Sequence, residues 1–323
     1  MPFIPRHGGV AIGAMRNETS GSFPERVFIH EVVLRDGIQN ETTLVPTDRK
    51  IELVNGLIRS GIHRIELSSF VNPRLVPQMA DAETLWERLE RPPGVLFSAL
   101  ILGEKSLERA LRCRVPHGGI FVSASETHSL RNSNRTVAEA TAEAFRLIDR
   151  AKSRGMEIRA GVMNAFGCAY EGPVPPEKVT GLVKAFLDHG PDEICLADTS
   201  GMAHPVQVGD LLRRVRSVTG AVPLSLHLHN TRGLGLANLW EALRHGVTIF
   251  DTSLGGLGGC PFIPGAKGNI ATEDTVHLLH HSKIETAIDL RRLVALSRDF
   301  EAFMGREFPA MISHLRDPRS CDP

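Results

Sequence analysis

Two histidines, His227 and His229, alternate along a short apolar run with one leucine between them. On a β-strand this alternation places both imidazoles on one face, where they could bind one metal ion. Taken alone, such a pair more often has a structural role. Asp36 follows another predicted strand and adds a carboxylate, and Asn269 adds an amide oxygen. This set of nitrogen and oxygen ligands suits Mg²⁺ or Mn²⁺, although it would also accept Zn²⁺.

Other charged and polar residues follow predicted strands and could take part in the same chemistry. Arg35, beside Asp36, could bind an oxyanion or form a structural salt bridge. Glu66 and Asp198 are either active-site acids or buried, paired carboxylates. Asn164 follows the fifth predicted strand, so it is expected in the same region.

A glycine-rich segment runs from Gly255 to Gly268 and contains Cys260. It is either a flexible connection or a mobile lid that places Cys260 over the site after substrate binds. The chain has 5 cysteines, which are widely spaced and include no CxxC pair. This pattern argues against a disulfide scaffold and predicts a reducing, cytoplasmic location.

The elements that would position these residues alternate along the chain. Short β-rich runs and amphipathic stretches follow one another eight times. Each short run is rich in Val, Ile, Leu or Phe, which is typical of parallel strands buried on both faces. The predicted strands are Val27–Val33, Arg64–Leu67, Leu96–Leu100, Gly119–Val122, Glu157–Val162, Glu193–Ala197, Leu224–Leu228 and Ile249–Ser253.

Helical patterns fill the gaps between the strands. Thr47 is a predicted N-cap, and Pro176 and Pro205 fall in the first turns of later helices. Eight β-then-α units predict a (β/α)₈ TIM barrel, whose active site lies at the carboxyl ends of its strands. An open doubly wound sheet is the alternative, but no GxGxxG or GxxxxGK[ST] motif follows the first strand.

The predicted domain organisation is simple. Residues 1–25 form a flexible leader without the apolar segment of a secretory signal. Residues 26–305 form the barrel domain, which ends in an extra helix over Asp289–Met304. Residues 306–323 form a tail.

The charge balance limits the classes of binding partner that can be expected. Among 323 residues, Lys+Arg and Asp+Glu each number 37, so no basic excess points to nucleic acid. No apolar run approaches the roughly 18 residues of a membrane span. Neither a nucleic acid nor a membrane is therefore expected as a partner.

Several motifs together resemble the 3-hydroxy-3-methylglutaryl-CoA (HMG-CoA) lyase family. The likeness runs from about Val27 to past Asp274 and covers most of the chain. The matching segments are Glu31–Glu41, Ile65–Glu66, Ser69–Val71, Val76–Asp81, Gly167–Gly172, Gly256–Pro261, Gly265–Ala266 and Gly268–Asp274. The same superfamily of metal-dependent barrels also contains Claisen-type synthases.

This resemblance implies a retro-Claisen cleavage of HMG-CoA to acetyl-CoA and acetoacetate, a step of leucine degradation. It assigns the Mg²⁺ or Mn²⁺ ligands to Asp36, His227, His229 and Asn269. It assigns enolate stabilisation to Arg35 and essential acidic roles to Glu66 and Asp198. The candidates for proton transfer are His227, Asp198 and Cys260. The resemblance also favours a homodimer.

The segment after the fourth predicted strand is the expected contact for coenzyme A. It spans Ser125–Asn134 and includes Arg131 and Asn132. Its position at the carboxyl end of a barrel strand is the reason for this assignment.

Several positions depart from the usual lyase sequence, among them Leu34 in place of a proline, and two of them could contact the acyl group. Arg232 stands where a tyrosine is usual, and Asn164 lies where small residues are usual. Arg232 either binds a differently placed substrate carboxylate or is a solvated loop residue. The first interpretation favours citramalyl-CoA or another branched 3-hydroxyacyl-CoA. A Claisen-type synthase is the nearest other enzyme, and a non-catalytic acyl-CoA-binding barrel is the alternative outside enzymes.

Overall fold

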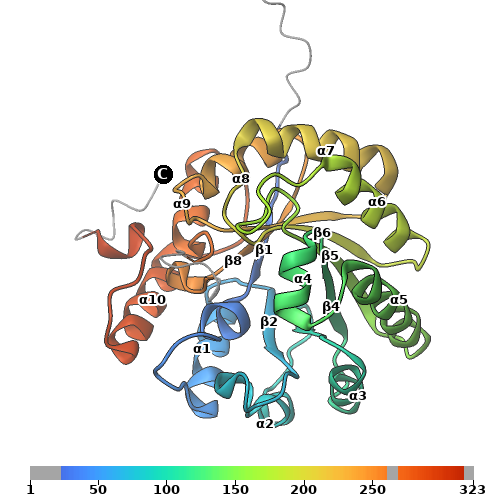
Figure 1. The fold of residues 1–323 in the computed structure, drawn as a ribbon. Coiled ribbons are helices and arrows are strands. Elements are labelled where there is room, and N and C mark those ends of the chain that lie inside the picture. The colour runs from blue at the N-terminus through green and yellow to red at the C-terminus, as the bar shows by residue number, and fades with distance from the viewer. Residues whose placement is uncertain (1–22, 260–267, 316–323) are drawn as a thin grey trace, which may run out of the picture.

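Eight parallel strands close into a barrel in chain order, with β1 paired to both β2 and β8 (Figure 1). The computed structural model describes residues 23–259 and 268–315. The strands are β1 (Phe28–Glu31), β2 (Arg64–Ser69), β3 (Leu96–Leu100), β4 (His117–Ser123), β5 (Glu157–Met163), β6 (Glu193–Asp198), β7 (Leu224–Leu228) and β8 (Ile249–Thr252). The predicted TIM barrel is confirmed, and the open sheet is excluded by the closure.

The strands are almost wholly buried because helices cover their outer face while side chains fill the barrel. Every residue of β6 and β7 is buried. The helices are α1 (Thr47–Arg59), α2 (Ala82–Arg88), α3 (Glu104–Arg112), α4 (Glu126–Ser133), α5 (Val137–Ser153), α6 (Pro176–Leu187), α7 (Pro205–Thr219), α8 (Gly235–Arg244), α9 (Thr272–His281) and α10 (Leu290–Met304). No helix in this described part of the chain is long and apolar enough to cross a membrane.

The predicted C-terminal boundary of the first strand, Val33, is wrong. The strand stops at Glu31, and Val33–Gly37 forms a single π-helical turn. The amides of Arg35, Asp36 and Gly37 all donate to the carbonyl oxygen of Val32, at 2.8–3.1 Å. The chain therefore curls at the carboxyl end of β1 instead of continuing along it.

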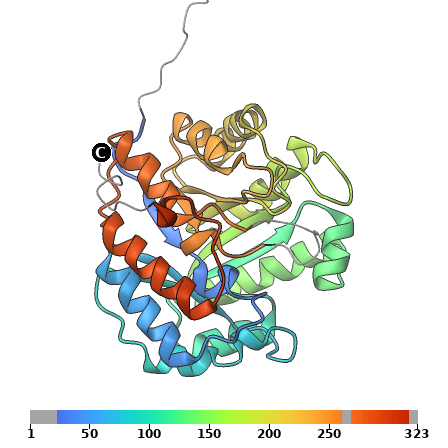
Figure 2. The same cartoon turned by 90° about the vertical axis from the view of Figure 1, so that its left-hand side faces the viewer.

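The predicted C-terminal helix is confirmed as α10, and its N-cap Asp289 accepts a hydrogen bond from the Arg292 amide at 3.1 Å. Helix α10 lies alongside α1 on the outside of the barrel (Figure 2). The predicted N-cap of α1 is wrong, since the helix begins at Thr47 with Pro46 as its N-cap. The Thr47 hydroxyl instead donates to Asp81 Oδ2 at 2.7 Å.

A buried ionic network fills the barrel interior below its mouth. The guanidinium of Arg159, on β5, lies 2.9 Å from Glu193 Oε1 on β6 and donates to Asp251 Oδ1 on β8 at 2.7 Å. The Arg159 side chain is only 2% exposed. Charges this deeply buried are tolerated only when they are paired. The stability of β5, β6 and β8 therefore depends on the ion pairs that their side chains form with one another.

Replacing Arg159 by Met should lower the free energy of unfolding by about 3–5 kcal/mol, because two buried carboxylates would lose a shared counter-charge. Urea unfolding followed by circular dichroism measures this loss. The control is Arg150→Met, which removes a half-exposed arginine paired with Glu108 and should cost less than about 1 kcal/mol. Equal losses in the two variants would contradict the prediction.

Candidate metal centre and active site

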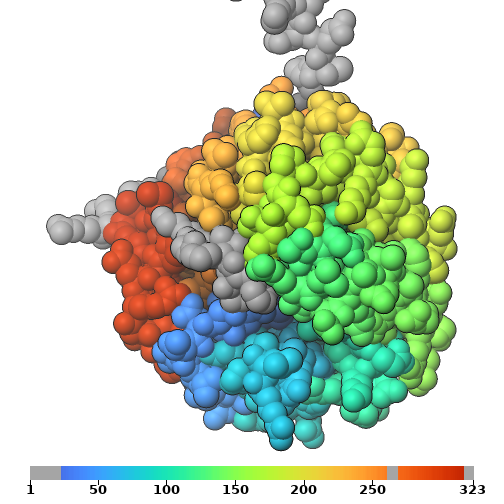
Figure 3. Space-filling view, viewed as in Figure 1, coloured from blue at the N-terminus to red at the C-terminus, as the bar shows by residue number. Residues whose placement is uncertain are grey.

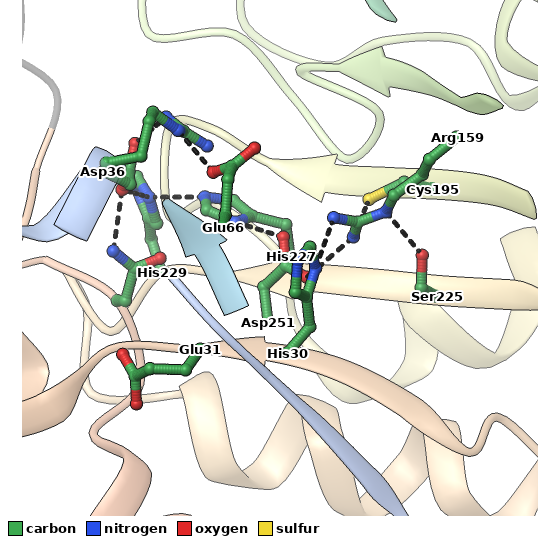
Figure 4. Close-up of polar contacts among 12 residues, drawn as sticks. His30, Glu31, Asp36, Glu66, Arg159, Cys195, Ser225, His227, His229 and Asp251 are labelled. Carbon is green, nitrogen blue, oxygen red and sulfur yellow. Dashed lines mark hydrogen bonds and ion pairs between the residues drawn. The ribbon is translucent and has the colours of Figure 1, made fainter. Parts of the chain in front are cut away.

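Three metal-ligand candidates meet at the carboxyl end of the barrel. Asp36 lies in the turn after β1, and His227 and His229 lie in and just after β7. One ligand atom from each residue lies within 4.8 Å of the other two, and all three residues are buried (Figure 4). The two Nε2 atoms of the histidines are 3.0 Å apart, and His229 Nε2 is 3.9 Å from Asp36 Oδ2.

Asn269 joins this group from the far end of the glycine-rich segment. It forms a β-bridge with His229, and its Nδ2 donates to Asp36 Oδ2 at 2.7 Å and to the Leu257 carbonyl at 2.9 Å. Its buried Oδ1 has no hydrogen-bond partner among the described residues. A buried amide oxygen without a donor would be satisfied by a cation. The four residues therefore fit a divalent ion.

The protonation states also suit a metal. Burial opposes ionisation of Asp36, but the charges of Arg35 and the two histidines outweigh it and hold the pKa of Asp36 at about 2. Burial and the neighbouring His227 lower the pKa of His229 to about 4. At neutral pH the carboxylate is charged and the His229 imidazole is neutral, which are the forms that bind metal ions.

Asp251 is a further candidate site residue, which the sequence analysis missed. Its Oδ2 lies 3.0 Å from His227 Nδ1, while its Oδ1 accepts from Arg159 and lies 3.1 Å from His30 Nδ1 (Figure 4). Burial disfavours its charge, but Arg159 and the two histidines hold the pKa of Asp251 well below its usual range. The ionised carboxylate keeps the proton on His227 Nδ1, so the Nε2 lone pair is free for a metal. A single acid within the apolar strand β8 was the signal available in the sequence.

Arg35 is held between two carboxylates beside the metal-ligand group. Its Nε donates to Glu66 Oε2 and its Nη1 to Asp36 Oδ1, each at 2.5 Å. Glu66 comes from β2, so this arginine links two neighbouring strand ends. The planar guanidinium carries five N–H donors, which leaves others for a substrate oxyanion.

Asp198 lies at the end of β6 and is almost fully buried. Its Oδ1 accepts from the amides of Met202 and Ala203 at 2.8 and 3.1 Å, and its Oδ2 has no hydrogen-bond partner among the described residues. Burial outweighs these amide donors and raises the pKa of Asp198 to about 6. A carboxyl group with a pKa near neutrality suits proton transfer.

Asn164 and Arg232, the departures predicted to contact the acyl group, both contact the turn after β6. Asn164 is buried with a φ of 54°, and its Oδ1 accepts from Ser200 Oγ at 2.7 Å. Arg232 is exposed, and its Nη1 donates to the carbonyls of Ser200 and Gly201 at 2.8 and 2.7 Å.

The remaining predicted site residues lie elsewhere. Arg131 and Asn132 are exposed on α4, and the Arg131 guanidinium stacks 4.3 Å from the centre of the Tyr170 ring. The surfaces of α4 and of the segment after β5 adjoin one another in Figure 3. Cys260 lies outside the described residues.

Buried carboxyl groups hold both ends of the glycine-rich segment. Glu31 Oε1 accepts from the Leu254 amide at 2.9 Å, and its Oε2 accepts from Thr272 Oγ1 at 2.6 Å. Glu273 accepts from the Gly255 amide at 3.0 Å.

At Gly258, where φ is +110°, a Cβ would lie only 2.6 Å from Asn269 Nδ2. Glycine is needed there because the backbone passes directly against a candidate ligand.

A closed parallel barrel with a histidine, carboxylate and amide group at its mouth defines a TIM-barrel enzyme with a candidate divalent-metal centre. The profile of the HMGL-like family matches residues 26–300. Hydroxymethylglutaryl-CoA lyase YngG of Bacillus subtilis is 39% identical over 288 residues, which cover 89% of this chain and 96% of that protein. (R)-citramalyl-CoA lyase of Chloroflexus aurantiacus is 40% identical over 298 residues, which cover 89% of this chain and 94% of that protein.

A solved structure agrees with these relatives. An HMG-CoA lyase from Acinetobacter baumannii, in complex with coenzyme A and 3-methylmalate, matches with a TM-score of 0.87 and 40% identity. The match covers 92% of this chain and 97% of that one. The chain belongs to the HMGL-like family of HMG-CoA lyases, as the sequence motifs predicted, and it is a carbon–carbon lyase.

Replacing Asp251 by Asn should weaken Mn²⁺ binding about 10- to 100-fold, because His227 would lose the charged partner that fixes its tautomer. Isothermal titration calorimetry with Mn²⁺ measures the dissociation constant, and circular dichroism checks that the variant is folded. Asp210→Asn, at a partly exposed position on α7, is the control. Unchanged affinity in a folded Asp251→Asn protein would show that this carboxylate does not orient the ligand.

Glu31 should make the fold less stable as the pH rises. Burial raises the pKa of Glu31 to about 8 from an ordinary 4.5, so the folded state keeps a proton that the unfolded state loses. The free energy of unfolding should therefore fall from about pH 5 to pH 8. Glu31→Gln should flatten only part of this decline. The pKa of Glu273 is also raised, to about 7, so this residue still lowers the free energy of unfolding as the pH rises.

Chemical denaturation at several pH values gives the slope. The control is Glu87→Gln at an exposed position of α2, which should leave the slope unchanged. Parallel pH profiles for wild type and Glu31→Gln would refute the assignment to Glu31.

Proposed function

We propose that this chain cleaves HMG-CoA to acetyl-CoA and acetoacetate with Mg²⁺ or Mn²⁺ as its cofactor, and so serves leucine degradation. The observation that carries this proposal is the grouping of Asp36, His227, His229 and Asn269 at one barrel mouth beside Arg35. The similarity to an HMG-CoA lyase over 96% of that protein's length supports the same substrate.

The four grouped residues would hold the ion. When bound, the divalent ion would supply Lewis-acid chemistry to the hydroxyl oxygen at C3 of the substrate. Oxygen and imidazole ligands without a thiolate favour Mg²⁺ or Mn²⁺ in this proposal. Asp251 holds His227 in the tautomer that can act as a ligand.

Residues of the chain would then move the protons. Asp198, with a raised pKa, is suited to take the proton of the 3-hydroxyl, and His227 and Cys260 are the other candidates. The C2–C3 bond breaks, its electron pair passes to the thioester as an enolate, and the C3 fragment leaves as the ketone acetoacetate. A proton returned to C2 gives acetyl-CoA.

Arg35 would stabilise the enolate. Glu66 and Asp36 fix its guanidinium, so its remaining N–H donors need no reorganisation when charge develops on the thioester oxygen. Glu66 would therefore act by holding Arg35 in place, without direct contact with the substrate.

Coenzyme A would bind near α4. Arg131 and Asn132 are exposed there, and Tyr170 supports the Arg131 guanidinium. An arginine braced on an aromatic ring presents a fixed cation to a phosphate group. The solved A. baumannii relative contains coenzyme A, which supports an acyl-CoA as substrate.

Citramalyl-CoA, cleaved to acetyl-CoA and pyruvate, is the second candidate substrate. Its carboxylate is attached directly to C3, one methylene closer than in HMG-CoA. The relative from C. aurantiacus, which is 40% identical, favours it. The sequence predicts Arg232 and Asn164 as the acyl-group contacts that would distinguish the two thioesters.

We propose the following context for the enzyme. Residues 26–305 are the catalytic domain, between a leader at 1–25 and a tail at 306–323, which agrees with the family match to 26–300. The protein acts as a homodimer in the cytoplasm. The described cysteines Cys113, Cys168 and Cys195 are free thiols, as expected in a reducing compartment.

The substrate is tested by assaying acetyl-CoA release from both thioesters with Mg²⁺ and with Mn²⁺. HMG-CoA should give the higher kcat/KM. Asp36→Asn should lower it by at least about 100-fold, since a lost ligand costs more than a lost outer-shell partner. A higher kcat/KM for citramalyl-CoA would move the function to the second candidate. A metal-free wild type that cleaves neither thioester would instead indicate a binding module.

A further inference from the structure

The side chains of Asn164 and Arg232 come from different loops and converge on one turn. Asn164, at the end of β5, contacts the Ser200 hydroxyl, and Arg232, after β7, binds the carbonyls of Ser200 and Gly201. Ser200 Oγ also accepts from the Ala169 amide at 3.0 Å. The turn is therefore held from both of its neighbouring loops.

This turn carries the hydrogen bonds that fix Asp198. The Gly201 amide donates to the Asp198 carbonyl at 3.0 Å, and the next two amides, of Met202 and Ala203, donate to Asp198 Oδ1. A displacement of the turn would carry these donors away from the carboxylate. The position of the Asp198 side chain thus depends on residues that do not touch it.

The packing around Gly201 leaves little room for the turn to move. Gly201 has a φ of +57°, and a Cβ at this position would lie 2.6 Å from Thr231 Cβ. Thr231 directly precedes Arg232, so the loop after β7 both packs against the turn and binds its carbonyls. Left-handed backbone and close approach together require glycine here.

Arg232 uses both hydrogens of its Nη1 on the backbone of this turn. Both carbonyl contacts come from Nη1, which has only two hydrogens, so this nitrogen has none left for a substrate. Asn164 is equally engaged, because its Nδ2 lies 3.3 Å from Ser123 Oγ while its Oδ1 accepts from Ser200.

We infer that Arg232 and Asn164 are positioning residues, which clamp the turn Ser200–Ala203 and so aim the Asp198 carboxylate at the reacting group. This inference rests on the proposed lyase function, in which Asp198 transfers a proton. It gives these two residues an effect on the chemical step, in place of direct contact with the acyl group. A misplacement of about 1 Å in such a group can cost about 100-fold in rate.

Three variants test the clamp in the HMG-CoA assay: Arg232→Met, Ser200→Ala and the double variant. Each single change should lower kcat about 10- to 100-fold while KM changes less than about threefold. The double variant should lose little more than the worse single variant, because both act on one turn. Arg213→Met, which removes an exposed arginine of α7, should leave kcat unchanged.

Hydrogen exchange gives a readout that needs no activity. Mass spectrometry of residues 199–204 should show faster amide exchange in both single variants and no change in Arg213→Met. If KM rose while kcat and amide exchange stayed unchanged, Arg232 would be a substrate ligand and the clamp would be refuted. A wild type that cleaved no thioester would refute the proposed function, and the clamp would then have no catalytic role. Unchanged amide exchange in the Arg232→Met and Ser200→Ala variants would refute the clamp itself.

Discussion

The carboxylate of Asp251 connects the stability of the barrel to the properties of its mouth. One of its oxygens accepts from Arg159, which is buried among the strands, and the other lies against His227 in the metal-ligand group. A buried anion with two such partners must stay ionised, so the imidazole above it must keep its proton on Nδ1. Packing at the centre of the barrel thus determines which histidine nitrogen faces the candidate metal position.

The sequence predicted the barrel well because parallel strands buried on both faces are continuous apolar runs. It failed at the end of β1 because apolarity reports burial and says nothing of backbone direction. Val32, Val33 and Leu34 are all fully buried, yet the chain turns there. The Thr47 cap failed for a similar reason, since its hydroxyl bonds to Asp81 and not to its own helix.

The candidate site was predictable where local pattern decided it. Alternation placed His227 and His229 on one face, and barrel topology brought Asp36 to them. Contacts between distant segments could not be read in this way. The shared turn at Ser200 joins Asn164 to Arg232, and nothing in either local sequence indicates that the other residue lies nearby. The role of Asp251 likewise depends on partners from three other strands.

The π-helical turn after β1 has a consequence for how the active site could evolve. Neighbouring residues on a strand point to opposite faces, so a straight β1 would send either Arg35 or Asp36 out of the barrel. The curl around the Val32 carbonyl lets adjacent residues bond to each other at one mouth. A single dipeptide can therefore supply both a cation for the thioester and an anion for the metal, and inserting or deleting one residue there would disrupt both at once.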